Sequence, residues 1–269
     1  MYYARKENIN MNNEIDNNTR VIWDAAIGLQ LVDSLKTSDF LNTISEIHCA
    51  GETTFYEAEL VVMSQYYLKK REEVGRTREA DVLSVRIAEI LLDTDYDFEL
   101  SLNQYRDIHK ELFAGIYNHN GKFRAYNIIK NEEILNGDTV IYGNASELER
   151  TVEYDISQEK EFIYEGLSTD ETIKHLANFI AGLWQIHPFE EGNTRTTAVF
   201  ILKYLESMGF SLNYKIFANH SKFFRNALVR ANYSNKNKNI YTTTEYIEIF
   251  LKNLILKEDN ILDNIQLNI

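Results

Sequence analysis

The residues best suited to chemistry lie close together, in the segment HPFEEGNTR that runs from His187 to Arg195. A histidine can take up a proton near neutral pH, and the carboxylate of Glu191 can hold Mg²⁺. Gly192 permits a turn whose backbone amides point toward an anion, and a helix that begins just beyond it would add its positive end. Arg195 can hold phosphate oxygens with its forked guanidinium. Together these residue types predict chemistry on a nucleotide.

Helices must position this segment on both sides. The only proline of the chain, Pro188, follows the histidine, and a residue before proline is disfavoured in the helical conformation. The preceding helix should therefore end near His187 and leave its imidazole at a corner between helix and loop. We expect that helix to begin at Ser168, where Glu171 has capping-box spacing, and a second helix to cover about 194–208.

Apolar residues recur with helical spacing along most of the chain. This periodicity predicts further helices over 19–48, 52–71, 78–94, 103–117, 220–232 and 242–257. The segment 121–155 differs, because it contains several glycines, β-branched residues at 139–141 and the turn signal Asn136-Gly137. These features predict one β-hairpin at about 127–145. The expected fold is mostly α with one β-hairpin.

The expected organisation has four parts. Residues 1–18 form a polar tail expected to be disordered, and 19–100 form an N-terminal helical region. Residues 101–257 form the core that contains the motif, and 258–269 form a C-terminal tail.

Composition narrows the partners and the setting. The 269 residues include 28 Lys and Arg against 41 Asp and Glu, a net charge of −13 that argues against a nucleic-acid partner. The single cysteine, Cys49, excludes a disulfide within the chain and favours a reducing, cytoplasmic setting. No apolar run approaches the roughly 18 residues that span a bilayer, so no membrane partner is expected. A hydrolytic metal site is disfavoured, because the chain has no HExxH pair.

The motif resembles the signature of Fic-domain proteins, His-Pro-Phe-x-Asp/Glu-Gly-Asn-Gly/Lys-Arg, and departs from it only at Thr194. The segment IHKELFAGIYNHNGKFR (108–124) is similar to the family's stretch ahead of its flap, and the predicted hairpin falls where the flap would lie. FRNALVRANY (224–233) is similar to the helix that helps to form the nucleotide pocket. The resemblance covers about 100–257 and implies a Fic-like helical fold with a hairpin flap.

The resemblance also implies a function. Most members transfer AMP from ATP to a hydroxyl side chain of a target protein, here a Tyr, Thr or Ser, with Mg²⁺ as cofactor. His187 would be the general base, and Glu191 would hold Mg²⁺. The flap would align the target segment by strand addition. The ATP phosphates would be bound by Gly192, Asn193, Thr194 and Arg195.

Two positions depart from the family's usual pattern. Many members have a second arginine three residues after the first, where this chain has Ala198. Many also carry an inhibitory helix of the form Ser/Thr-x-x-x-Glu-Gly/Asn. The nearest match is TTFYEA (53–58), in which Thr53 and Glu57 fit and Ala58 departs. The resemblance therefore implies an N-terminal inhibitory helix whose Glu57 lacks its usual arginine partner.

Alternative functions remain open on the sequence alone. The same site could transfer another phosphate-linked group or remove AMP. With the second arginine absent, the domain could instead bind a nucleotide as a non-catalytic sensor. The other histidines, His109 among them, are expected to be structural or on the surface. The sequence is compatible with an oligomer and does not identify the target protein.

Overall fold

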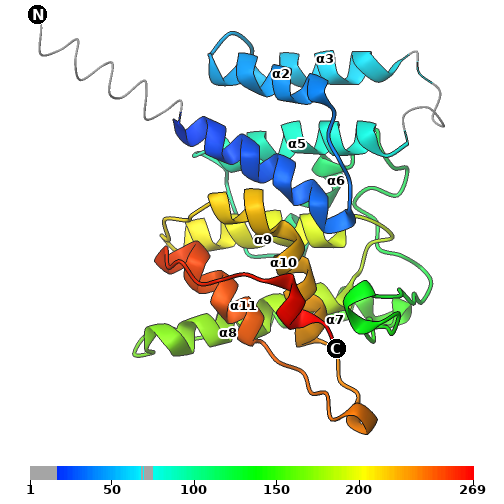
Figure 1. Cartoon of the computed structure of the whole chain (residues 1–269), viewed down its shortest axis with the longest axis vertical. Coiled ribbons are helices and arrows are strands. Elements are labelled where there is room, and N and C mark those ends of the chain that lie inside the picture. The colour runs from blue at the N-terminus through cyan, green and yellow to red at the C-terminus, as the bar shows by residue number, and fades with distance from the viewer. Residues whose placement is uncertain (1–16, 68, 70–74) are drawn as a thin grey trace, which may run out of the picture. The chain divides into compact units, whose positions relative to one another are not determined.

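The computed structural model of the protein describes residues 17–67, 69 and 75–269. Within them the chain is mostly α-helical, as predicted (Figure 1). The tail predicted over 1–18 lies outside the described residues except for Asn17 and Asn18, which begin a helix over 17–28.

The chain divides into two compact units. One comprises Met1–Tyr96 with Tyr214–Asn219, and the other comprises Asp97–Asn213 with His220–Ile269. The second unit holds all nine residues of the motif.

In the first unit, the long helix predicted over 19–48 is divided. Ser34 adopts a left-handed conformation with φ of 56° after a 3₁₀ turn, and this ends the first helix. Ser38 then caps the next helix by accepting a hydrogen bond from the backbone N–H of Leu41. The end of the helix predicted over 52–71 lies partly outside the described residues. The helices of this unit are residues 17–28, α2 (Asp39–Cys49), α3 (Phe55–Tyr67) and α5 (Thr77–Leu92).

Helix α5 forms the core of the first unit and packs against α3. It is buried along most of its length, and its buried charged residues Glu79, Asp81 and Arg86 are paired. The fully buried Asp81 accepts hydrogen bonds from the backbone and hydroxyl of Ser38, at 2.8 and 2.5 Å, and from the hydroxyl of Tyr66 at 2.5 Å. This carboxylate ties α5 to the start of α2 and the end of α3.

Helix α9 lies at the centre of the second unit, with α6 and α8 packed against it. Its residues are buried from Asn193 to Leu205, so the helix that begins at the motif is also the core helix. Helix α7 packs on α6 and α8, and α11 packs on α8. Helix α10 bends at His220, where its backbone leaves the helical region. The helices of this unit are α6 (Leu102–Leu112), α7 (Leu148–Glu161), α8 (Thr169–Ile186), α9 (Asn193–Ser207), α11 (Glu245–Leu251) and, from His220 onward, α10 (Lys215–Ala231).

The predicted β-hairpin is wrong as paired strands, and we call the segment 127–145 the flap. Asn136 and Gly137 do form a turn with positive φ, and Glu132 and Asp138 bond across it through the backbone. Beyond the turn, the backbone N–H of Lys130 donates to the hydroxyl of Thr139 instead of to a carbonyl. This side-chain bond replaces a backbone ladder. Among the described residues only an isolated antiparallel bridge, Asn235 to Ile240, is found.

The sequence analysis also missed helix α7. Its buried residues Leu148, Val152, Ile156 and Glu159 follow helical spacing. The first half of α7 lies within the segment 121–155, whose glycines and turn signal led to the prediction of a hairpin. Glu159, the last buried residue of α7, bonds this helix to neighbouring segments. The carboxylate of Glu159 accepts from the hydroxyls of Tyr164 and Tyr204 and lies 2.7 Å from Nε2 of His175.

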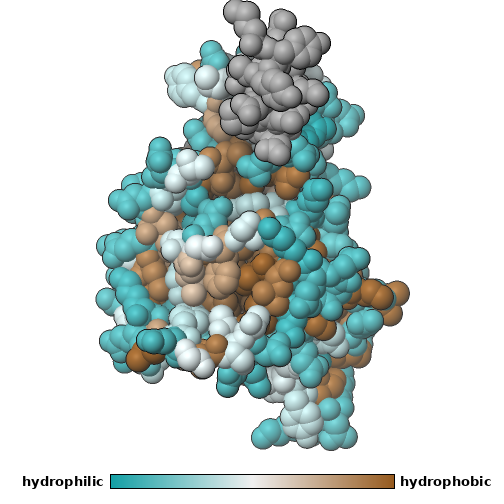
Figure 2. Space-filling model, turned by 90° about the vertical axis from the view of Figure 1, so that its left-hand side faces the viewer, coloured by the Kyte–Doolittle hydropathy of each residue, from teal (hydrophilic) through white to brown (hydrophobic). Residues whose placement is uncertain are grey.

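The surface is mixed in polarity. On the face drawn in Figure 2, apolar patches lie among hydrophilic side chains. Exposed apolar residues include Ile129 and Ile141 of the flap, which are 80% and 82% exposed. No helix in the described part of the chain is long and apolar enough to cross a membrane.

Candidate active site

The end of α8 sets the position of His187. The predicted capping box of Ser168 and Glu171 opens this helix, and an apolar face buries it along its length. The helix ends at Ile186, and His187 adopts a left-handed conformation with φ of 50° and ψ of 56°. The prediction that Pro188 ends the helix here is confirmed. A non-glycine residue with positive φ is uncommon and needs support from its surroundings.

Arg124 supplies that support. The side chain is buried, and its Nε donates to the carbonyl of His187 at 2.9 Å. Its two terminal nitrogens donate to the carbonyls of Tyr126 and Gly143 at 2.6 Å each. A weaker bond of 3.3 Å reaches Ile186. One guanidinium therefore joins both arms of the flap to the end of α8 and satisfies carbonyls that the helix leaves unpaired.

The imidazole of His187 is buried and its tautomer can be assigned. Nδ1 lies 3.4 Å from the carbonyl oxygen of Trp184. A carbonyl can only accept, so Nδ1 carries the proton and Nε2 keeps its lone pair. Burial lowers the pKa of His187 well below its ordinary value, and the nearby charge of Lys130 acts in the same direction. At neutral pH the ring is therefore uncharged, with Nε2 able to accept a proton.

The loop between His187 and α9 is closed by Asn193. Its side-chain Oδ1 accepts from the backbone N–H of Phe189, and its Nδ2 donates to the carbonyl of the same residue, both at 2.8 Å. Phe189 is fully buried. Both ends of the Asn193 side-chain amide are therefore hydrogen-bonded within the loop. Asn193 can donate to an anion only through its backbone N–H.

Gly192 is required at its position for two reasons. Its φ of 77° is left-handed, and an added Cβ would lie 2.0 Å from Cζ of Phe113. As the N-cap of α9, it brings the first amides of that helix to the loop. Free amides at a helix N-terminus form a natural anion site.

The next two motif residues are buried at the start of α9. Thr194 Oγ1 accepts from the indole N–H of Trp184 at 2.9 Å, so its hydroxyl holds α9 to α8. The guanidinium of Arg195 lies over the ring of Phe113, 5.2 Å from its centroid. Phe113 therefore supports both Gly192 and Arg195.

Comparisons with known proteins identify the segment that contains these residues. A sequence model of the Fic/DOC family matches residues 99–205. Over 121 residues the chain is 26% identical to the protein adenylyltransferase VbhT of Bartonella schoenbuchensis (strain DSM 13525 / NCTC 13165 / R1), a match that covers 45% of this chain and 24% of VbhT. Residues 99–205 form a Fic/DOC-family domain. The chain spans about a quarter of the length of this relative.

Solved Fic domains share the fold. The N-terminal Fic domain of a Bartonella effector protein from Bartonella sp. AR 15-3 is similar with a TM-score of 0.51 at 13% identity, over 67% of this chain and 83% of that chain. The N-terminal Fic domain of Bep8 from Bartonella sp. 1-1C gives 0.51 at 15% identity, over 71% and 88%. These similarities establish the fold.

In this Fic domain, sequence reasoning missed the part played by His109. Its Nδ1 accepts from the backbone N–H of Gly121 at 2.8 Å, so Nε2 carries the proton and donates to the carbonyl of Glu191 at 3.1 Å. The ring stacks on Phe189 with centroids 3.7 Å apart. Burial lowers the pKa of His109 to about 3. The available signal was its spacing with Tyr105 and Leu112 on one apolar helix face.

A metal would have one protein carboxylate here. Mg²⁺ is commonly held by one or two carboxylates together with substrate phosphates and water. The described residues contain no group of three or more His, Cys, Asp and Glu placed to hold a metal by themselves. Glu191, next to Gly192 and the first amides of α9, therefore has the chemistry expected of a carboxylate that holds Mg²⁺ together with a bound nucleotide. Its neighbour Glu190 lies 3.9 Å from Nε2 of His119.

Thr53 and Glu57 belong to the first unit, whereas the other predicted site residues are in the second. Glu57 is exposed at the start of α3 and forms a capping box with Thr54. Its carboxylate accepts from the backbone N–H of Thr54 at 2.9 Å, and the Thr54 hydroxyl accepts from the Glu57 N–H at 3.2 Å. The Thr53 hydroxyl adds a bond of 3.3 Å. The backbone bond from Thr54 is the main reason why the pKa of Glu57 is lowered.

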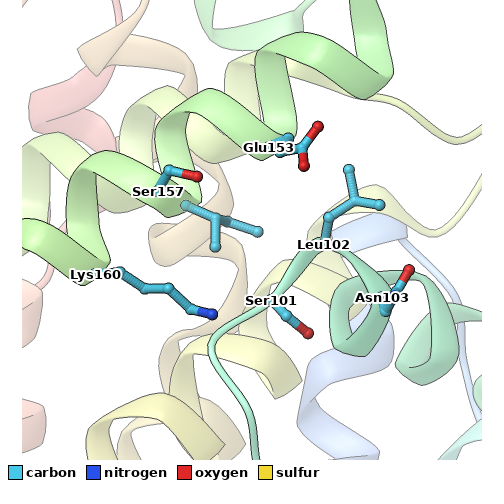
Figure 3. A pocket seen from close by; sticks show the side chains of 7 residues that line it. Ser101, Leu102, Asn103, Glu153, Ser157 and Lys160 are labelled. Atoms are coloured by element: carbon cyan, nitrogen blue, oxygen red, sulfur yellow. The ribbon is translucent and has the colours of Figure 1, made fainter.

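A cavity of about 180 Å³ lies elsewhere in the second unit, where α6 begins beside α7 (Figure 3). Its lining includes Ser101 and Asn103 from the start of α6, and Ser157 and Lys160 from α7. None of the motif residues lines it. This cavity is therefore separate from the candidate active site. Its Lys160 forms an ion pair with Glu99 at 3.3 Å.

Proposed function

We propose that this Fic-family protein is an adenylyltransferase that moves AMP from ATP to a hydroxyl side chain of a target protein. The observation that carries the proposal is the tautomer of His187, which leaves Nε2 as a neutral base at the end of α8. Six residues later, the loop closed by Asn193 presents the first amides of α9. The similarity to a protein adenylyltransferase over 121 residues supports the same reaction.

The reaction would be a single displacement at the α-phosphorus. The hydroxyl oxygen of the target would form a bond to the α-phosphorus while Nε2 of His187 takes its proton. The bond between the α-phosphorus and the oxygen that bridges to the β-phosphate would break, and pyrophosphate would leave with that electron pair. The amides at Gly192 and the guanidinium of Arg195 would bind phosphate oxygens, so that the reacting atoms stay in line.

Glu191 would hold Mg²⁺ in the nucleotide complex. When bound, the ion would neutralise part of the phosphate charge. The chain positions the Glu191 backbone through His109 and the stacked ring of Phe189. This arrangement fixes the loop before any ligand binds.

The flap would receive the target segment. It lacks an internal ladder, and Ile129 and Ile141 expose their side chains on it. An extended segment of the target would lie along the flap, as in strand addition. The chemistry would suit a Tyr, Thr or Ser hydroxyl, since each supplies one proton to the base.

Glu57 would restrain the activity. Its carboxylate sits at the exposed start of α3 with the spacing of the inhibitory pattern, and Thr53 bonds to it. The capping box gives the same carboxylate a structural role. The two roles therefore have to be separated by variants that remove one and keep the other.

Incubation of the full chain with Mg²⁺ and ATP labelled separately at the α and γ phosphates, alone and with cell lysate, tests the proposal. AMP transfer would place only the α label on protein, and His187→Ala would abolish it, whereas His220→Ala would retain it as a matched control. Transfer of the γ label would identify a phosphotransferase instead. Loss of the α label from protein labelled in advance would indicate the reverse reaction.

A non-catalytic nucleotide sensor is the second candidate, and Ala198 is the feature that favours it. This buried alanine stands where many members have the second phosphate-binding arginine. Saturable ATP binding without label on any protein, in the wild type and in Glu57→Gln, would support the sensor and contradict the transferase.

A further inference from the structure

The ring of Tyr142 covers the imidazole of His187. The two ring centroids lie 4.6 Å apart with the planes tilted by 47°. Trp184 approaches the imidazole from another direction, with centroids 5.2 Å apart and the rings perpendicular. His187 is thus held between one aromatic residue from its own helix and one from the flap. The resemblance to Fic proteins assigned no role to Tyr142.

The backbone on both sides of Tyr142 is tied to the end of α8. The carbonyl of Ile141 accepts from the side-chain amide of Gln185 at 2.9 Å. The carbonyl of Gly143 accepts from Arg124 at 2.6 Å. Gly143 also passes so close to α8 that an added Cβ would lie 2.8 Å from the carbonyl oxygen of Ile186. The position of the Tyr142 ring is therefore fixed at both neighbouring residues.

The hydroxyl of Tyr142 reaches a buried ion pair. It donates to Oε1 of Glu132 at 2.9 Å, and Oε2 of Glu132 lies 2.7 Å from a terminal nitrogen of Arg225 on α10. The side chain of Glu132 is 1% exposed. A buried carboxylate needs such partners, and once paired it holds them firmly. The chain of contacts runs from α10 through Glu132 and Tyr142 to His187.

The charges near the imidazole come from three elements. Lys130 of the flap, Arg225 of α10 and Arg124 each lower the affinity of His187 for a proton. Glu132 supplies the negative charge paired with Arg225. The bond from Nδ1 to Trp184, at 3.4 Å, is long and holds the ring weakly by itself. Packing by Tyr142 is needed to keep the imidazole in one orientation.

We propose that Tyr142 is a positioning residue, held by Glu132 and Arg225, that keeps the imidazole of His187 in the orientation required of the base. This inference rests on the proposed function for its catalytic consequence. The geometric part is independent of it, since it concerns the exposure and mobility of one ring. A misplacement of about 1 Å in such a group can cost about a hundred-fold in rate.

Three variants separate the ring from its hydroxyl. Tyr142→Leu removes the aromatic cover, Tyr142→Phe keeps the ring and loses the bond to Glu132, and Glu132→Ala removes the acceptor. Tyr154→Leu is the matched control, because Tyr154 is 61% exposed on α7. Thermal melting of each variant checks that the fold is retained.

The first readout is the rate at which diethyl pyrocarbonate modifies His187, followed by mass spectrometry with His220 as internal reference. We expect the rate to rise about ten-fold in Tyr142→Leu, because this variant removes the ring that covers the imidazole. The rise should be smaller in Glu132→Ala and Tyr142→Phe, which keep the ring but lose the bond that holds it. Tyr154→Leu should not change the rate. An unchanged rate in a folded Tyr142→Leu would overturn the proposal.

The second readout is transfer of the α label. We expect kcat to fall about ten- to a hundred-fold in Tyr142→Leu with the KM for ATP unchanged, because the base is displaced while the phosphate site is intact. A rise in KM without a fall in kcat would overturn the positioning role. If no variant or wild type transfers label, yet modification of His187 rises as expected, the positioning stands and the proposed function fails.

Discussion

Asn193 closes the motif loop on Phe189 with both ends of its side-chain amide. One end accepts from the Phe189 N–H and the other donates to the Phe189 carbonyl, each at 2.8 Å. The family pattern suggests a phosphate ligand at this position, whereas the structure shows a side chain that shapes the loop. Under the proposed function, Asn193 would therefore shape the phosphate site through its side chain and contact the phosphate only through its backbone.

Asn193→Asp should destabilise the protein with almost no change in shape. An aspartate can accept from the Phe189 N–H, but its second oxygen faces the Phe189 carbonyl and leaves it without a donor. We expect the free energy of unfolding to fall by about 1–3 kcal/mol, with weaker nucleotide binding. Urea unfolding and calorimetric titration with ATP would measure both effects. Asn178→Asp, which loses an exposed bond to Lys174, should change neither by a comparable amount.

Gly192→Ala should be far more costly than an alanine at another left-handed glycine. Gly166 has φ of 85° and open space around its Cβ position, whereas Cβ at Gly192 would overlap Phe113. Both substitutions incur the backbone strain, and only Gly192→Ala adds the clash. We expect it to cost about 1–3 kcal/mol more than Gly166→Ala. Denaturation of the two variants gives the difference directly, and equal losses would contradict the role of Phe113.

Acid should destabilise the fold through two buried histidines. Burial lowers the pKa of His187 and His109 below the value in the unfolded chain. Below about pH 6.5 the unfolded chain therefore binds protons that the folded chain does not, so stability falls as the pH falls, by about 1.4 kcal/mol per pH unit for each group. Above that pH both histidines are neutral in both states and the slope vanishes.

The measurement is urea unfolding, followed by circular dichroism, at several pH values on either side of that point. His109→Gln should lower overall stability and also reduce the slope by the equivalent of one proton. His220→Gln serves as the matched control. A slope in His109→Gln equal to that of the wild type would show that this ring is protonated in the folded protein.

Two substitutions separate restraint from capping at α3. Glu57→Gln removes the negative charge but keeps an oxygen that can accept from the Thr54 N–H. Thr54→Ala removes the other half of the capping box and leaves the Glu57 carboxylate intact. If the carboxylate restrains the enzyme, transfer of label should rise several-fold in Glu57→Gln and stay at the wild-type level in Thr54→Ala. A rise in both variants would instead point to loosening of the helix.

Local signals in the sequence were enough to predict much of the site. Pro188 placed His187 at the end of a helix, and Ser168 with Glu171 placed the start of that helix. Both depend on contacts within four residues, which a sequence displays directly. The motif pattern also placed Gly192 at a turn before α9, where the structure has it.

Contacts between distant segments could not be predicted in this way. The partner of Arg124 is the backbone of His187, and the partner of His109 is the carbonyl of Glu191, more than 60 and 80 positions away in sequence. Nothing in the periodicity of α6, or in the segment around Arg124, indicates such a partner. The hairpin prediction was wrong for a related reason. The backbone groups of the flap bond to side chains such as that of Thr139 and to other segments, and turn signals alone do not reveal this.

The bond between Trp184 and Thr194 has a practical consequence. The chain contains two tryptophans, Trp23 in the first unit and Trp184 in the second. The indole N–H of Trp184 is bonded at the start of α9, and its ring borders the imidazole of His187. Each unit therefore contains its own fluorophore. In Trp23→Phe all indole emission would originate beside the loop proposed to bind phosphate, so ligand occupancy could be followed optically without any attached dye.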